Sequence, residues 1–194
     1  MVDAVRAQLV DGGFDLLTME AVADRSGVHR TTVYRRWRDV GGLLADVLAD
    51  VTGDDWSPPQ TGSLETDLAA VNREIHAALT ADPPITTALI AASFRSPQAA
   101  EALQTFWADR YARCAAIVRR AIDRGEVPAD TDPRAVIIAA TAPLYHTLVL
   151  LRASADTDLA AHSAHQVSVA ARAGAFARPS SELLTTGMRG SGVR

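Results

Sequence analysis

The sequence predicts an all-α protein of about nine helices, with a small N-terminal three-helix head followed by a larger helical domain. Apolar residues recur at steps of three and four along most of the chain, which is the spacing of one helix face. No sustained alternation of apolar and polar residues indicates a strand. Proline and glycine fall between the periodic segments, where they separate successive helices.

Composition narrows the class of protein. The chain has 194 residues, of which 48% are hydrophobic and 22% charged, as in folded rather than disordered proteins. Its single cysteine, Cys114, excludes an intrachain disulfide and suits a reducing compartment. The N-terminus lacks the basic and apolar regions of a signal peptide, so a cytoplasmic protein is expected. The formal net charge of −4 by itself argues against a nucleic-acid-binding protein.

The head is expected to span residues 1–51. Thr18 is a suitable N-cap, and Gly27 stands where a left-handed residue would end the helix that Thr18 begins. Four helical segments are predicted here, over residues 3–11, 18–26, 30–36 and 40–51.

A stretch rich in proline, glycine and aspartate, residues 52–62, is interpreted as a linker. The larger domain is expected to span 63–177 and to be followed by a flexible tail, 178–194. Its predicted helices cover residues 63–81, 85–94, 98–124, 133–152 and 157–176.

The most informative segment has the pattern of a helix-turn-helix. Val22 and Ala23 are small enough for two helices to cross closely, and Gly27 permits the turn between them. Val28 and Val33 are expected to point into the core, which leaves the polar residues of the second helix facing a DNA major groove.

Charge is concentrated in the same segment. Residues 25–38 contain five arginines and no acidic residue, a local balance of +5. All basic residues of the chain are arginines, so any charged phosphate contact would come from a guanidinium group. The turn at Gly27 and the positive charge of residues 25–38 together predict a DNA-binding head, although the net charge of the whole chain is −4.

The head resembles that of the TetR family of bacterial regulators. The resemblance rests on Gly13-Phe14, Leu17-Thr18-Met19, Val22-Ala23, Ser26-Gly27-Val28, Thr32-Val33-Tyr34, Trp37 and Leu43-Leu44, with Ala142-Pro143-Leu144-Tyr145 as a further similarity in the larger domain. It implies a homodimeric transcriptional repressor, not an enzyme, that binds a palindromic double-stranded DNA operator and is released by a small-molecule effector.

The resemblance also implies roles for individual residues. Base edges would be contacted by His29, Arg30, Thr31 and Arg35, and phosphates by Thr32, Tyr34 and Arg36. The family usually has a phosphate-binding lysine at the start of the fourth helix, where this chain has Val40, so Arg38 is expected to substitute for it.

The larger domain is expected to hold the effector and to form the dimer. The candidate ligand-binding residues are aromatic residues, one histidine and the single cysteine of this domain: His76, Phe94, Phe106, Trp107, Tyr111, Cys114 and Tyr145. They predict a mostly apolar or aromatic effector. The last two helices carry more apolar and small residues than one buried face needs, so they are expected to make a four-helix bundle with a second subunit.

Three other functions compete with that of a ligand-responsive repressor. An enzyme is disfavoured because the chain has no glycine-rich phosphate loop, nucleophile elbow or His-Glu-x-x-His motif. A metal-responsive regulator would use His146, His162 and His165, but a thiol or carboxylate cluster is missing, and no metal or other cofactor is expected. The third is a helical ligand-binding protein with weakened DNA binding, suggested by Val40 and the short first helix.

The apolar run 135–151 is too short for the roughly 20 residues of a membrane span and is interrupted by Pro143 and His146. A buried helix, and no membrane partner, is therefore expected.

Effector binding is expected to reach the head through the fourth helix, by favouring a conformation in which the spacing of the two heads no longer fits the operator. The residues expected to transmit this change are Leu44, Val47 and Leu48.

Overall fold

The protein is all-α, as predicted. The computed structural model describes residues 1–52, 56–154 and 158–178, and in these ranges it contains nine α-helices and no strand beyond one isolated bridge. A 3-10 turn, Phe14–Leu16, follows the first helix. The helices are α1 Val2–Gly12, α2 Met19–Ser26, α3 Arg30–Arg36, α4 Val40–Thr52, α5 Leu64–Thr80, α6 Ile85–Ser93, α7 Pro97–Asp123, α8 Pro133–Tyr145 and α9 Leu159–Arg172.

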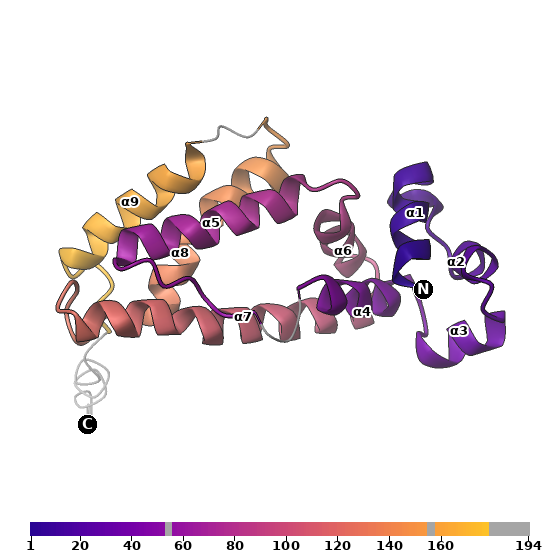
Figure 1. Ribbon diagram of the computed structural model, residues 1–194, viewed down its shortest axis with the longest axis horizontal. Helices are drawn as coiled ribbons and strands as arrows, with labels where there is room; N and C mark the ends of the chain where they lie inside the picture. The colour runs from indigo at the N-terminus through magenta and orange to yellow at the C-terminus, as the bar shows by residue number, and fades with distance from the viewer. Residues whose placement is uncertain (53–55, 155–157, 179–194) are drawn as a thin grey trace, which may run out of the picture.

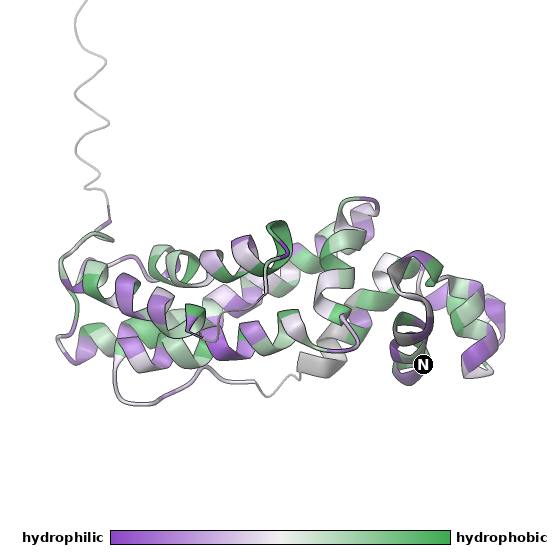
Figure 2. Ribbon diagram, turned by 90° about the horizontal axis from the view of Figure 1, so that it is seen from above, coloured by the Kyte–Doolittle hydropathy of each residue, from purple (hydrophilic) through white to green (hydrophobic). Residues whose placement is uncertain are grey.

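The molecule is elongated, with α1, α2 and α3 at one end and α5, α8 and α9 at the other (Figure 1). Helix α7 runs along most of its length, and α4 and α6 lie where the two ends meet (Figure 1). Most helices carry both apolar and polar stretches, as amphipathic helices do (Figure 2).

Helix starts follow the sequence signals closely. The side chains of Thr18, Ser63, Ser96 and Asp132 accept hydrogen bonds from backbone N–H groups in the first turns of their helices, at 3.1, 3.2, 3.2 and 2.8 Å. Gly27 ends α2 in the left-handed conformation, with φ of 69°.

The core of the head continues into the larger domain. Leu43, Leu44 and Val47 of α4 are at most 1% exposed and belong to one apolar cluster with the buried residues of α1 and α2. The same cluster includes residues of α6 and the start of α7: Ile85, Ala88, Leu89, Ala92 and Ala99. The expected boundary between residues 51 and 63 is therefore crossed by shared packing. Of the expected coupling residues, the side chain of Leu48 lies outside the described part.

A second core lies between α5, α7, α8 and α9. Its polar centre is Asn72, which is fully buried and whose Nδ2 donates to the carbonyl oxygens of Ala140 at 3.0 Å and Ala160 at 3.1 Å. Ser163 Oγ donates to the same Ala140 oxygen at 2.7 Å. These bonds join α5, α8 and α9 at one point, and they satisfy the Nδ2 of Asn72, whereas its buried Oδ1 has no hydrogen-bond partner among the described residues.

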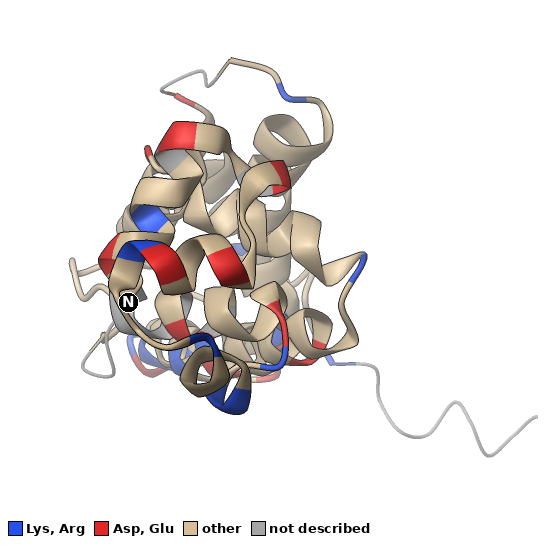
Figure 3. Ribbon diagram, turned by 90° about the vertical axis from the view of Figure 1, so that its right-hand side faces the viewer, with Lys and Arg blue, Asp and Glu red and all other residues tan. Residues whose placement is uncertain are grey.

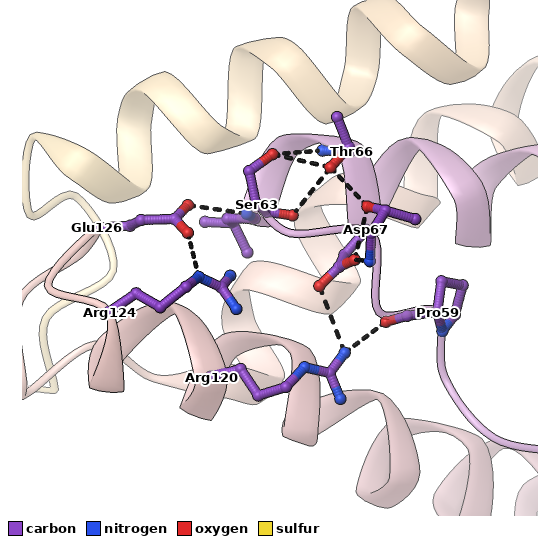
Figure 4. A network of polar contacts seen from close by, with 9 residues as sticks. Pro59, Ser63, Thr66, Asp67, Arg120, Arg124 and Glu126 are labelled. Atoms are coloured by element: carbon purple, nitrogen blue, oxygen red, sulfur yellow. Dashed lines mark hydrogen bonds and ion pairs between the residues drawn. The ribbon is translucent and has the colours of Figure 1, made fainter.

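The segment expected to be a linker is fixed to α7 from residue 56 onward. Arg113 Nη1 donates to the Trp56 carbonyl oxygen at 3.0 Å. Arg120 donates to the Pro59 carbonyl oxygen and pairs with the buried Asp67 at 3.3 Å (Figure 4). Residues 53–55 lie outside the described ranges, as do residues 179–194 of the expected tail.

The prediction of one helix over residues 133–152 is wrong at the C-terminal end. Helix α8 stops at Tyr145 and the chain continues as a π-helical turn, His146–Leu150, in which Leu151 N donates to His146 O at 2.9 Å. Pro143 lies inside α8 and has no N–H to donate, which weakens the regular ladder at this point. Arg152 then has a positive φ of 51°.

The helix expected over 157–176 ends early, at Arg172. Gly174 has φ of 79°, which turns the chain back so that Asp132 N donates to Phe176 O at 2.7 Å.

The region Pro133–Leu150 has the length and mean hydropathy of a membrane-spanning helix, and 28% of it is buried within the chain. The expected buried helix therefore leaves much of its apolar surface uncovered in the single chain.

Gly41 is required by a close approach of two helices. A Cβ atom at Gly41 would lie 2.5 Å from Ala99 Cβ and 2.8 Å from Ser96 Oγ, whereas a Cβ at Gly42 would have only Asp39 Oδ1 nearby, at 3.9 Å. The absence of a side chain at Gly41 thus allows α4 to pack on the start of α7.

Replacing Gly41 by alanine should lower the free energy of unfolding by about 1–3 kcal/mol, because α4 and α7 must separate. The matched variant Gly42→Ala should be neutral or should stabilise by up to about 1 kcal/mol, the usual gain for a helical glycine. Urea unfolding followed by circular dichroism measures both. Equal effects of the two substitutions would show that the contact is not tight.

Candidate nucleic-acid interface and ligand cavity

Helix α3 is held by one buried side chain and presents the others to solvent. Val33 is fully buried and anchors the helix in the core of the head. His29 precedes α3 as its N-cap, and its Nδ1 accepts from Thr31 N at 3.4 Å. All eight residues expected to contact DNA are exposed: His29, Arg30, Thr31, Thr32, Tyr34, Arg35, Arg36 and Arg38.

Acidic residues from outside the counted window partner several of these groups. Arg30 Nη2 lies 3.0 Å from Asp24 Oδ2, on the preceding helix. The Tyr34 hydroxyl donates to Glu20. This hydrogen bond lowers the pKa of Glu20 and raises the pKa of Tyr34.

Arg36 is engaged in a similar way. Its Nη2 lies 3.3 Å from Asp46 Oδ2, which also accepts the Trp37 indole N–H at 2.7 Å, and its guanidinium lies over the Trp37 ring at 4.7 Å. Arg35 and Arg38 have no carboxylate partner within the described ranges.

The local charge of +5 counted along residues 25–38 therefore overstates the positive charge of the surface around α3. Arg25 also pairs with an acid, Asp11, at 2.5 Å, so three of the five arginines in the window have carboxylate neighbours. Figure 3 looks onto the head and shows blue along α3 at the lower edge, with red on the neighbouring helices. Asp24 lies one residue outside the counted window, whereas Asp11 and Asp46 are brought to it by the fold.

A cavity of about 360 Å³ lies between α5, α6, α7 and α8. Its lining includes five of the seven residues expected to bind a ligand: Phe106, Trp107, Tyr111, Cys114 and Tyr145. The Trp107 ring centre lies 5.3 Å from that of Tyr145 and 4.9 Å from that of Phe106, in edge-to-face contacts. One helix, α7, thus supplies most of the aromatic wall.

The other two expected residues, His76 and Phe94, do not line the cavity. Phe94 follows the last residue of α6 and is 82% exposed, because α6 ends before its ring can turn inward. His76 lies on α5 beside the face that lines the cavity, and its Nε2 is buried without a partner. The lining positions of α5 are Val71, Glu74, Ile75, Ala78 and Leu79, a helical spacing that omits residue 76.

Sequence reasoning missed Trp56 and Arg110, which also line the cavity. Arg110 lies over the ring of Trp56 at 4.1 Å and over that of Phe106 at 5.2 Å. Burial lowers the pKa of Arg110. The steps from Phe106 to Arg110 to Cys114 could have placed Arg110 on this face, but no sequence signal places the linker residue Trp56 here.

The titratable groups of the aromatic wall are neutral at physiological pH. Burial raises the pKa of Tyr111 and Tyr145 and raises that of the Cys114 thiol to about 11. The tyrosines can therefore offer hydroxyl groups, while Cys114 behaves as a small apolar side chain.

The histidines of the metal alternative are not gathered into a site. His146 and His162 are exposed, and His165 Nδ1 lies 3.0 Å from Glu65 Oε1. Within the described ranges, no group of three or more His, Cys, Asp or Glu residues could hold a metal ion.

The exposed face of α3 and the turn at Gly27 define a helix-turn-helix regulator, whose larger helical domain contains the cavity. Residues 1–47 match the family described as bacterial regulatory proteins, tetR family, and residues 58–167 match the tetracyclin repressor-like C-terminal domain. The chain belongs to the TetR family of transcriptional regulators, a class that is not enzymatic.

Relatives and a solved structure agree with this membership. The chain is 35% identical to the HTH-type transcriptional regulator AqdR of Rhodococcus erythropolis over 71% of this chain and 67% of AqdR. It is 32% identical to the DNA-binding transcriptional repressor TetR of Mycobacteroides abscessus over 73% of this chain and 76% of that protein. The solved TetR family transcription regulator SCO0332 superposes with a TM-score of 0.70 at 29% identity, over 87% of this chain and 94% of that one.

Cys114 should react slowly with iodoacetamide in the folded protein. With its pKa raised to about 11, the thiol holds about a hundredfold less thiolate at neutral pH than an exposed cysteine does. The rate should rise as the pH increases toward that value. Mass spectrometry measures it on the only cysteine of the chain, and the chain unfolded in guanidinium is the control. Equal rates in the folded and unfolded chain would contradict the burial.

Proposed function

We propose that the protein is a homodimeric repressor that leaves its palindromic operator when a small, mostly apolar molecule fills the cavity. The observation that supports this most is the position of α6. Thr86 of α6 lines the cavity, while its neighbours Ile85 and Leu89 pack in the core shared with α4. A ligand that shifts α6 would therefore shift the head, which is the differential effect that release requires.

On DNA, α3 would enter the major groove with Arg30 and Arg35 toward guanine edges, His29 and Thr31 beside them. Thr32, Tyr34, Arg36 and Arg38 would contact phosphates. Arg30 would exchange its carboxylate partner Asp24 for the DNA, because the exposed pair contributes little to stability. Binding to the operator would take place in the cytoplasm.

Dimerisation would use α8, the turn after it and α9. The exposed large apolar residues of this region are Ile138, Leu150, Leu151 and Val169. Two copies of these helices would form a four-helix bundle that covers them and places the two heads about 34–36 Å apart, one turn of DNA. The sequence of the relative from Mycobacteroides abscessus, named a repressor, supports the direction of control.

A ligand-binding protein with weakened DNA binding is the second candidate. It is favoured by the acidic partners of Arg25, Arg30 and Arg36, which reduce the positive charge available to phosphates.

DNA binding distinguishes the two candidates. Affinity for a duplex from the chain's own upstream region should fall steeply between about 50 and 200 mM salt, because counterions are released from the phosphates. Arg35→Ala should cost about 1–3 kcal/mol of binding, whereas Asp24→Asn should strengthen binding because it frees Arg30. Fluorescence anisotropy of the labelled duplex measures all of these.

The matched control is Arg119→Ala, an exposed arginine on α7 away from the head. If affinity is flat with salt, or if Arg35→Ala behaves like Arg119→Ala, the repressor is excluded and the second candidate is favoured.

The dimer is tested by Val169→Glu on α9, where Val169 is 49% exposed. A carboxylate buried in the bundle would carry a large desolvation cost, so the variant should sediment as a monomer. Leu16→Glu changes a 64% exposed leucine on the head and should leave the dimer intact. Analytical ultracentrifugation gives both masses. A dimeric Val169→Glu protein would place the interface elsewhere.

A further inference from the structure

We infer that the cavity takes an uncharged, flat aromatic molecule with one or two polar atoms, and that Trp56 is the ring against which this molecule packs. The inference rests on the proposed function and specifies the ligand of the same site.

The walls favour a flat ring over a flexible chain. Five of the lining residues are aromatic: Trp56, Phe106, Trp107, Tyr111 and Tyr145. Aromatic side chains bind other rings with a preferred geometry that a saturated chain cannot exploit. The volume of about 360 Å³ is near the lower end of the usual range for ligand pockets, about 300–1,000 Å³, so the ligand is compact.

The charges around the cavity favour a neutral ligand. Among the described residues, its lining contains one cation, Arg110, and one anion, Glu74, and both are engaged with Trp56. The guanidinium of Arg110 covers the indole ring at 4.1 Å, and Glu74 Oε2 accepts the indole N–H at 2.9 Å. A charged ligand would have to disturb one of these contacts and would lose its own hydration in an apolar cavity.

Polar atoms on the ligand can be satisfied by two hydroxyl groups. Tyr111 and Tyr145 line the cavity and remain protonated, so each can donate or accept one hydrogen bond. Thr141 is less available because its Oγ1 already donates to Ile137 O at 2.9 Å. A phenol or an aryl ketone matches these two tyrosines.

Trp56 is held in place before any ligand binds. Its carbonyl oxygen accepts from Arg113 at 3.0 Å, its indole N–H is bound by Glu74, and its ring lies against Arg110. Pro59, three residues on, is bound by Arg120. A wall fixed in this way loses little entropy on binding, which favours affinity for a rigid ligand.

The test compares three molecules with the same fused bicyclic ring framework on the full-length protein by isothermal titration calorimetry. They are 1-naphthol, which is flat and neutral, decalin-1-ol, which is neutral but not flat, and 1-naphthoate, which is flat but charged. We expect 1-naphthol to bind about tenfold more tightly than either. Trp56→Ala should weaken the binding of 1-naphthol by about tenfold and leave the affinity for decalin-1-ol nearly unchanged. Trp56→Phe should keep most of the affinity for 1-naphthol.

Phe94→Ala is the matched control, because it removes an aromatic ring that lies outside the cavity, and it should leave all three affinities unchanged. Circular dichroism checks that each variant is folded. Tighter binding of decalin-1-ol or 1-naphthoate, no binding of any of the three, or an equal loss of all ligands in Trp56→Ala overturns the inference. The proposed function is judged separately, by binding of the unliganded protein to its upstream DNA in the same buffer.

Discussion

The packing of α4 on α6 and on the start of α7 is the contact on which the rest of the structure depends. Leu43, Leu44 and Val47 are buried there, and Gly41 leaves room for Ala99 at a distance that no side chain would allow. Because interiors are closely packed, a helix held in this way moves with its neighbours rather than independently of them. The DNA-binding head and the larger helical domain thus share one apolar core.

This shared core gives the cavity a route to the head through α6, which has Thr86 on the cavity and Leu89 in the apolar cluster that includes α4. Trp56, another part of the cavity wall, is held on α7 through its carbonyl oxygen. A ligand that shifts α6 would therefore act on α4. Physical continuity of this kind is necessary for coupling, and a difference in ligand affinity between two states must accompany it.

Local patterns in the sequence predicted most of the fold, because caps, turns and helix faces depend on residues close along the chain. Thr18 and Gly27 have the roles that their positions indicated. The errors concern contacts between distant segments. The acids that partner Arg30 and Arg36 are placed by folding, and Trp56 is held at the cavity by Arg113, Glu74 and Arg110, all distant from it along the chain. Phe94 was expected in the interior on composition alone, and the end of α6 leaves it outside.

Hydrogen exchange measured by mass spectrometry on the unliganded protein tests the shared core most directly. If α4, α6 and the first turns of α7 form one cooperative unit, their backbone amides should exchange with similar protection and should lose it together as denaturant is added. Gly41→Ala should lower the protection of all three segments at once. Early exchange of α1–α4 while α6 remains fully protected would contradict the account, because it would mean that the head opens without disturbing the larger helical domain.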